Sequence, residues 1–276
     1  MNYDRIIHDV VEEYRNSPID ILDIGAVGEY RYLTIQKPAY ISTIRDIDTL
    51  CNSNPHDKKI LEIGSFLGPV SISLKRMGYS VYALDIPEFY QSSSLKSLYA
   101  KHAIPFAGQN LRKRQLPYEC NCFDAVILCE VIEHLNFNPL PVFKEINRVL
   151  KKDGYMYIRM PNQSSLENRV RLLLGKSIHN PIDDYFAQLD KHDNMIVGLH
   201  WREYTMSEAV RLIEKMGFKT TLTYYFWEPG SRECSRFKAL LERCLYYVPS
   251  FRPQQVVVGK KVLNVTYDFW FTDANL

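Results

Sequence analysis

The fold of this chain is decided by one glycine-containing stretch, Lys59-Ile-Leu-Glu-Ile-Gly-Ser-Phe-Leu-Gly-Pro-Val-Ser71. Its apolar start predicts a strand over residues 60–63, and a helical pattern follows from Val70 to Met77. Gly64 and Gly68 lie between them, where glycine permits a sharp turn and lets a ligand approach the backbone. The first N–H groups of the helix have no partner within it. The stretch therefore predicts a strand–turn–helix unit that can hold a ligand at the turn.

An acidic residue follows the glycine turn at the spacing found in nucleotide-binding folds. The next apolar strand, Val81–Leu84, is followed by Asp85, which lies 23 positions after Glu62 (85 − 62). In nucleotide-binding βαβ units, an acidic residue here accepts hydrogen bonds from ribose hydroxyls. The spacing Glu-x-Gly-x-x-x-Gly differs from the Gly-x-Gly-x-x-Gly of dinucleotide sites, and Phe66 and Pro69 narrow the space for a pyrophosphate. We therefore predict a nucleotide-like cofactor without phosphates; the alternative is a tight turn without a ligand.

Strand and helix patterns alternate along the rest of the chain. Further strands are predicted over 123–129, 155–160, 219–226 and 255–262, and helices over 93–102, 141–150 and 205–216. This alternation predicts an α/β fold with a mostly parallel sheet and a site at the carboxyl ends of the strands. A helix over 3–14 and a short helix over 43–50 precede it. We divide the chain into an N-terminal helical extension, 1–52, and an α/β domain, 53–276, with an insertion over 161–198.

The bulk composition excludes several classes of protein. The formal net charge is only +2, so we do not expect nucleic acid as a partner. The N-terminus does not resemble a secretory signal, and the sequence contains no run of eighteen apolar residues. None of the six cysteines forms a Cys-x-x-Cys pair. These features predict a cytoplasmic protein with reduced thiols. The similar stretch Asp23-Ile-Gly-Ala-Val-Gly28 is a weaker candidate for the glycine turn, because no suitably spaced acidic residue follows it.

Taken in order, these segments resemble the class I S-adenosylmethionine-dependent methyltransferases. The match covers Lys59–Met160 well and Leu199–Phe218 in outline. It includes Leu61-Glu-Ile-Gly64 through Gly68, Ala83-Leu-Asp-Ile86, the segment from Phe123 to Leu135, Glu145 to Gly154, and Met160-Pro-Asn162. The resemblance implies a Rossmann-like, doubly wound sheet of seven strands with helices on both faces. It also implies S-adenosylmethionine as cofactor and S-adenosylhomocysteine as product. Phe66 stands where the family often has glycine.

The resemblance also implies roles for individual residues. The methionine end of the cofactor would lie along the turn, on Glu62, Gly64, Ser65, Phe66 and Gly68. Asp85 would hold the ribose, Ile86 would pack on the adenine, and Asn110 or Leu111 would contact the adenine edge. Cys129 and Glu130, at the end of the strand 123–129, would lie beneath the cofactor.

Methyl transfer to a hydroxyl group requires a group that removes the proton. Candidates follow the strand 123–129 as Glu130-Val-Ile-Glu133-His134, and His200 precedes the predicted helix over 205–216. We predict that His134, His200 and Glu133 are catalytic; the alternative is that they hydrogen-bond their own loops. We assign no metal ligand. Two carboxylates and two imidazoles, Glu130 included, nevertheless make a plausible divalent metal site. Such a quartet is similar to that of methyltransferases acting on the 2′-hydroxyl at small-RNA 3′ ends.

We therefore expect O-methylation of a small polar or sugar-containing acceptor, such as a glycan precursor. The insertion over 161–198 should cover the acceptor cleft, and its polar side chains can bind a polyhydroxylated molecule. Its segment 164–174 mixes leucines with arginines and can make peripheral contact with a membrane, although packing within the protein is favoured. The alternatives are a metal-dependent RNA 2′-O-methyltransferase and a non-catalytic cofactor-binding module.

Overall fold

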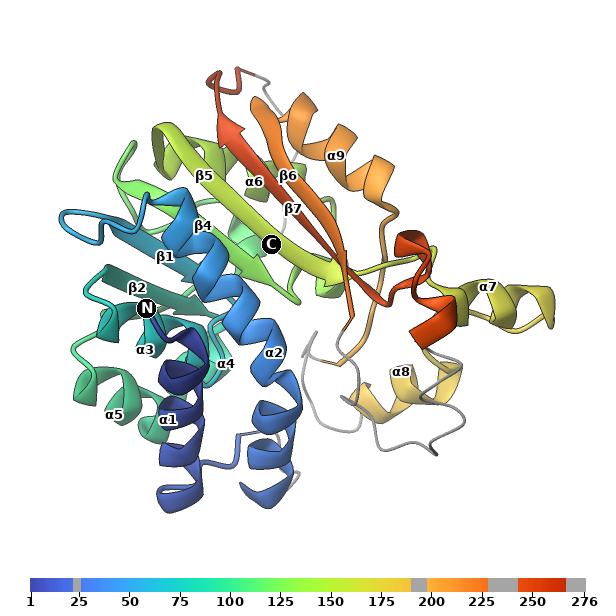
Figure 1. The fold of residues 1–276 in the computed structure, drawn as a ribbon, viewed down its shortest axis with the longest axis horizontal. Coiled ribbons are helices and arrows are strands. Elements are labelled where there is room, and N and C mark those ends of the chain that lie inside the picture. Colours follow the sequence, from blue (N-terminus) through green and yellow to red (C-terminus); the bar gives the residue numbers. More distant parts are fainter. Residues whose placement is uncertain (22–25, 190–197, 228–242, 267–276) are drawn as a thin grey trace.

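The computed structural model describes residues 1–21, 26–189, 198–227 and 243–266. The helices and strands follow one another along the chain in the alternating order that the sequence predicts (Figure 1). They are α1 Tyr3–Asn16, α2 Ala26–Leu50, β1 Lys59–Ile63, α3 Pro69–Arg76, β2 Ser80–Asp85, α4 Pro87–Gln91, α5 Ser93–Lys101, β3 Phe106–Gly108, β4 Phe123–Cys129, α6 Leu140–Val149, β5 Leu150–Pro161, α7 Leu166–Leu173, α8 Ile182–Leu189, α9 Met206–Lys215, β6 Phe218–Phe226 and β7 Gln254–Lys261. Short 3-10 helices span Leu111–Lys113, Ile132–His134 and Pro249–Phe251.

A mixed sheet of seven strands runs through the molecule in the order β3-β2-β1-β4-β5-β7-β6. The strands β1 to β5 pair in parallel, whereas β7 pairs antiparallel with both β5 and β6. The predicted fold class is thus confirmed, including its mostly parallel character. The three-residue strand β3 was not recognised in the sequence, because so short a strand carries no periodic pattern. The strand order reverses between β1 and β4, and a ligand crevice is expected at that point.

The two faces of the sheet carry separate hydrophobic cores. Alternate residues of β4 contribute to each: Ala125 and Ile127 face one core, and Val126 and Leu128 face the other. Helices α1, α2, α3 and α5 pack on the first face, and α6 and α9 pack on the second. Helix α2 crosses the sheet diagonally in Figure 1. Both faces are therefore covered, as expected of a doubly wound fold.

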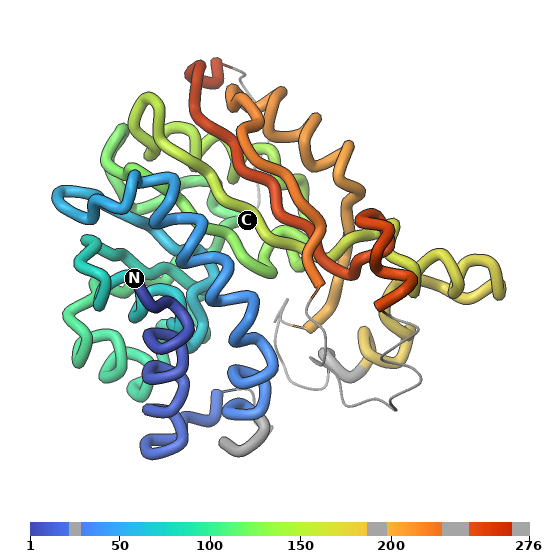
Figure 2. The backbone as a smooth tube through the Cα atoms, in the orientation of Figure 1, coloured from blue at the N-terminus to red at the C-terminus, as the bar shows by residue number. Residues whose placement is uncertain are grey.

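The N-terminal region differs from the expectation of one short helix over 43–50. Helix α2 begins at Ala26 and continues through Pro38 to Leu50. The internal proline and the aromatic residues on several sides of the helix conceal its pattern in the sequence. Helices α1 and α2 lie side by side (Figure 2), and the buried carboxylate of Asp48 joins them to the sheet layer. It accepts hydrogen bonds from Tyr3 (2.7 Å) and Tyr79 (2.6 Å).

The insertion after β5 contains α7 and α8, which project from one end of the molecule (Figure 1). A parallel bridge between Asn162 and Tyr204 closes the base of this segment. Asp190 and the other residues over 190–197 lie outside the described part of the chain. The division at residues 52 and 53 stays a prediction. Within the described ranges, no helix is both long and apolar enough to cross a membrane.

Candidate active site

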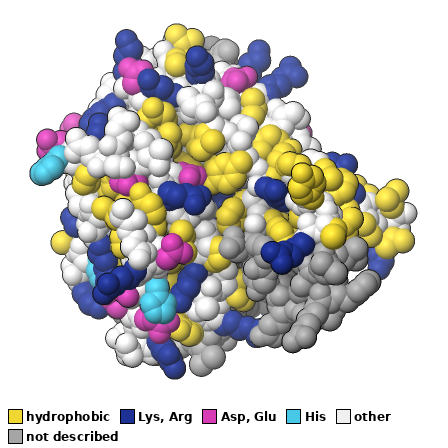
Figure 3. Space-filling view, in the orientation of Figure 1, with side chains coloured by type: hydrophobic (Ala, Val, Ile, Leu, Met, Phe, Trp, Pro, Cys, Tyr) yellow, Lys and Arg dark blue, Asp and Glu magenta, His cyan; other side chains and the backbone are white. Residues whose placement is uncertain are grey.

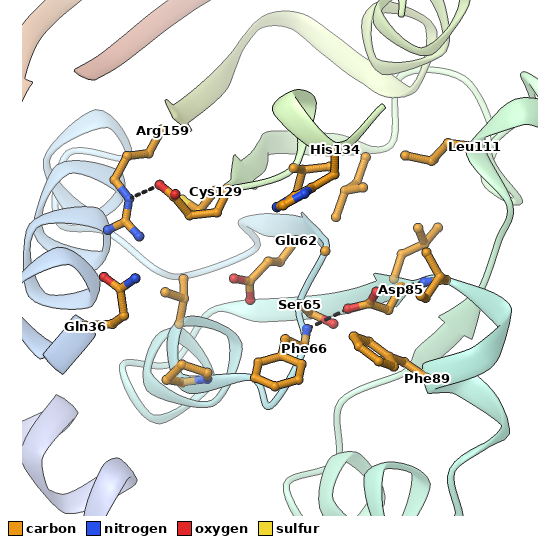
Figure 4. Close-up of a pocket in the computed structure, with 18 of the residues that line it drawn as sticks. Gln36, Glu62, Ser65, Phe66, Asp85, Phe89, Leu111, Cys129, His134 and Arg159 are labelled. Atoms are coloured by element: carbon orange, nitrogen blue, oxygen red, sulfur yellow. Dashed lines mark hydrogen bonds and ion pairs between the residues drawn. The ribbon is translucent and has the colours of Figure 1, made fainter. Parts of the chain in front are cut away.

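A cavity of about 420 Å³ lies at the carboxyl ends of β1, β2, β4 and β5 (Figure 4). Most of the predicted site residues line it, namely Glu62, Gly64, Ser65, Phe66, Asp85, Ile86, Leu111, Cys129, Glu130, His134 and His200. Three predicted residues do not. Gly68 packs against Tyr99, Asn110 uses its side chain to accept a hydrogen bond from the Arg112 backbone (3.0 Å), and Glu133 is fully buried.

The two glycines of the turn are required by close packing. Both have a φ of 74°, in the left-handed region that favours glycine. A Cβ at Gly64 would lie 2.4 Å from a methyl group of Val131, and a Cβ at Gly68 would lie 2.9 Å from the Tyr99 hydroxyl. Both glycines thus let neighbouring elements close on the turn, and Gly64 also borders the cavity.

The backbone of Phe66 has a φ of 45°, which is also in the left-handed region, where any residue with a side chain is strained. That conformation costs a non-glycine residue about 1–2 kcal/mol. Its backbone N–H donates to Asp85 Oδ2 (2.6 Å), and its carbonyl accepts from the Tyr99 hydroxyl (2.9 Å). Its ring packs between Tyr32 and Phe89, with centroids 6.1 Å and 5.5 Å away. These contacts hold the strained backbone in place, so Phe66 forms an aromatic wall where relatives often have glycine.

Two buried carboxyl groups at the ends of adjacent strands differ in charge at neutral pH. Burial raises the pKa of Asp85 to about 6, although hydrogen bonds from the backbone N–H groups of Phe66 and Ile86 oppose this effect. Burial raises the pKa of Glu62 to about 8, against a hydrogen bond from the Ser71 hydroxyl. At pH 7, therefore, Asp85 is mostly ionised and Glu62 is mostly protonated.

Several cavity residues were missed by sequence reasoning. Tyr32, Gln36 and Tyr40 come from one face of α2, at intervals of four residues, and a correct prediction of that helix would have revealed them. Arg159 in β5 is only 1% exposed. Its Nε donates to Glu130 Oε1 (3.3 Å), and its buried Nη1 has no hydrogen-bond partner among the described residues. A charged residue inside an apolar strand was the signal in the sequence.

The predicted catalytic residues form a cluster at the cavity edge. Glu133 and His134 belong to the 3-10 helix after β4, and His200 meets them from the segment before α9. The rings of His134 and His200 have centroids 5.1 Å apart. Burial lowers the pKa of His134 to about 4, so its imidazole is neutral at pH 7. Glu130 does not join this cluster; its carboxylate pairs with Arg159 and Gln254 instead.

A second, more polar cavity of about 380 Å³ adjoins the first one, and Glu130 and His200 line both. Its walls include Asn168 and Arg171 of α7, together with Asn180. Asn162 also borders it, but the amide of this residue is engaged in donating to the carbonyls of Ser250 and Arg252. The described part of the insertion therefore builds a polar pocket next to the cofactor-sized one.

Residues 61–158 match a family model described as a methyltransferase domain. The YqeM protein of Bacillus subtilis, named as a candidate methyltransferase, is 23% identical over 228 residues, which are 81% of each chain. A ubiquinone biosynthesis O-methyltransferase of Xanthomonas axonopodis pv. citri is 25% identical over 131 residues, covering 47% of this chain and 54% of that one. A solved S-adenosylmethionine-dependent methyltransferase from Archaeoglobus fulgidus has the same fold, with a TM-score of 0.54 at 14% identity over 84% of this chain and all of that chain (100%).

Proposed function

The chain belongs to the class I S-adenosylmethionine-dependent methyltransferases, and on that premise we propose that it methylates a hydroxyl group of a small polar acceptor. The observation that carries this proposal is the junction of two cavities at Glu130 and His200, one shaped for the cofactor and one polar. A sugar-containing molecule, such as a glycan precursor, fits the second cavity. The bound cofactor supplies a methyl group on a positively charged sulfur.

The residues of the larger cavity suit every part of that cofactor. Asp85 is an ionised acceptor for the ribose hydroxyls, and Ile86, Phe89 and Leu111 offer apolar contacts for the adenine. The amino-acid part of the cofactor carries an ammonium group and a carboxylate. It therefore needs a negatively charged partner for the first group and a positively charged partner for the second. We assign the ammonium to Glu62 and the carboxylate to Arg159, whose free Nη1 can donate. In Figure 4 both side chains extend toward the same cavity.

The reaction makes modest chemical demands on the protein. The sulfur leaves as a neutral thioether, so no acid is needed at the leaving group. The acceptor oxygen forms the new bond to the methyl carbon while the bond from carbon to sulfur breaks, and the hydroxyl proton is removed. The enzyme must align the two groups and stabilise the oxygen as it loses its proton. We assign this second task to Glu133, His134 and His200, because two of these side chains face the cofactor cavity.

The chemistry of the second cavity supports a polyhydroxylated acceptor. Arg171 and His179 contribute guanidinium and imidazole groups to its walls, and Asn168, whose amide nitrogen donates to Gln163 and Glu203, contributes its amide oxygen. Hydroxyl groups of a sugar can both donate to and accept from such side chains. Oxygen as the methylated atom also agrees with the name of the Xanthomonas relative. A formal net charge of +2 argues against the RNA alternative, and the complete cluster argues against a non-catalytic module.

A peripheral contact with membranes is also part of the proposal. Helix α7 exposes apolar side chains at its tip, on the right of Figure 3; these are Val170, Leu172, Leu173 and, one residue beyond the helix, Leu174. Arg171 and Lys176 lie close by in the sequence, and such a mixture favours the surface of an anionic bilayer. A lipid-linked sugar would then reach the polar cavity from the membrane surface. We also propose a cytoplasmic location for the reaction.

A transfer assay with cofactor labelled in its methyl group tests the proposal. The acceptors are nucleotide sugars, lipid-linked glycans, small phenols, amines and RNA. We expect label in a sugar-containing acceptor, with loss in His200→Ala and full transfer in His56→Ala, a change of an exposed histidine on another loop. Label in amines or RNA alone would contradict the proposal.

A further inference from the structure

The catalytic cluster contains a buried group that the fold leaves unsatisfied. Glu133 is fully buried, at 0% exposure, and neither of its carboxylate oxygens meets a donor from another described residue. Burying a carboxylate without a partner costs several kcal/mol or displaces its protonation, so native proteins rarely leave one in this state. One possible ligand atom from each side chain, a carboxylate oxygen of Glu133 and a ring nitrogen of His134 and of His200, lies within 4.8 Å of the other two. That spacing leaves room for one atom between them.

The two imidazoles are oriented in a way that prepares them as ligands. Nδ1 of His134 lies 2.8 Å from the carbonyl oxygen of Leu199, and Nδ1 of His200 lies 2.9 Å from Oε1 of Glu203. Both acceptors assign the ring proton to Nδ1, so that Nε2 of each ring keeps a free lone pair. Histidines that bind metals commonly donate their other N–H to a carbonyl or carboxylate in this manner. Asn168 of α7 in turn donates to Glu203 (3.0 Å) and holds it in place.

We propose that Glu133, His134 and His200 bind one divalent transition-metal ion, such as Zn²⁺, Mn²⁺ or Co²⁺. Two imidazoles and one carboxylate are the donor set that such ions prefer, whereas Mg²⁺ and Ca²⁺ favour oxygen ligands alone. A carboxylate beside a dication also removes the energetic cost of burying Glu133 without a partner. Three protein ligands leave coordination positions open.

From the position of the cluster we infer that the ion helps to deprotonate the acceptor hydroxyl, an inference that rests on the proposed function. His134 and His200 line the cofactor cavity, and His200 also lines the polar cavity, so an open coordination position can face the acceptor. A hydroxyl group bound there loses its proton to water more readily, because the cation stabilises the oxyanion. The oxygen then forms its bond to the methyl carbon. The electron pair of the broken carbon–sulfur bond stays on sulfur, giving neutral S-adenosylhomocysteine and the methyl ether.

Titration of the full-length, chelator-treated protein with Co²⁺ tests the site without cofactor or acceptor. We expect one ion per chain and visible absorption bands from a site with nitrogen ligands, with affinity at least about a hundredfold lower in His200→Ala and Glu133→Gln. Asn168→Ala should lower the affinity by about tenfold, through Glu203. His56→Ala, a change of an exposed histidine on a distant loop, should bind as the wild type does.

Folding of each variant is checked by circular dichroism and by its midpoint of unfolding in urea in the absence of metal. Co²⁺ should also raise the melting temperature of the wild type and leave that of Glu133→Gln unchanged. Absence of Co²⁺ binding, or equal binding by the folded variants, would overturn the metal site. Neither result would affect the proposed methyl transfer, which the acceptor screen tests separately.

Discussion

Binding of the cofactor product should release a proton from Glu62. This carboxyl group is mostly protonated at neutral pH because burial raises its pKa to about 8. The proposed partner, the ammonium group of S-adenosylhomocysteine, requires the ionised form. With that pKa, roughly one carboxyl in a hundred is ionised at about pH 6 and roughly one in ten at about pH 7. Affinity should therefore rise about tenfold over that interval, which is about 1.4 kcal/mol.

Asp85 adds a smaller effect of the same sign. Its pKa of about 6 means that the ionised fraction rises about twofold between about pH 6 and about pH 7. Isothermal titration calorimetry with S-adenosylhomocysteine in metal-free buffers of different ionisation enthalpy measures both the affinity and the proton release. We expect release of close to one proton at about pH 7 in the wild type. Glu62→Gln should keep only the twofold dependence; equal pH dependence in both proteins would refute the reasoning.

Three further outcomes are expected. Asp85→Asn should weaken binding of S-adenosylhomocysteine at least about tenfold in calorimetry, since hydrogen bonds to a charged acceptor contribute about 1.5–3 kcal/mol. Glu119→Gln, a change of an exposed carboxylate before β4 and away from the cavity, should leave the affinity unchanged. Arg159→Met should lower the affinity for S-adenosylhomocysteine by a similar factor. It should leave the affinity for 5′-methylthioadenosine unchanged, because that ligand lacks the amino-acid carboxylate. Equal losses of affinity for both ligands would exclude Arg159 from carboxylate binding. The free energy of unfolding measured in urea should be about 1 kcal/mol higher for Phe66→Gly than for Phe66→Ala, because only glycine adopts the left-handed φ of 45° without strain. The reverse order of stability would contradict that backbone conformation.

Local spacing was sufficient to predict the part of the cavity built around the glycine turn. Glu62, Gly64 and Asp85 occur on consecutive strand ends, and the parallel sheet brings those ends to one edge. The sequence pattern also predicted that His200 would approach Glu133 and His134, and the structure places these three together. It predicted Glu130 in the same group, but the pairing partner, Arg159, was not recognised.

The remaining features depend on contacts between distant segments. The helix α2 hides its cavity-facing residues because Pro38 and aromatic residues obscure its periodicity. The conformation of Phe66 depends on Tyr99 and Asp85, which lie in other elements, so no local rule for a turn accounts for it. The second cavity forms where α7 contacts the segment before α9. The spacing of residues along the chain does not predict this contact.

Tyr32, Gln36 and Tyr40 line the cavity proposed to hold the cofactor, so we expect its binding to stabilise the first fifty residues. A ligand that contacts only the native arrangement stabilises it, by about 2.7 kcal/mol at a concentration one hundred times its Kd. We expect part of that free energy to stabilise α2 and, through the hydrogen bonds of Asp48, α1. Amide hydrogens of both helices should then exchange more slowly when the cofactor product is bound. The level of cofactor would in this way govern how long the N-terminal helices survive proteolysis.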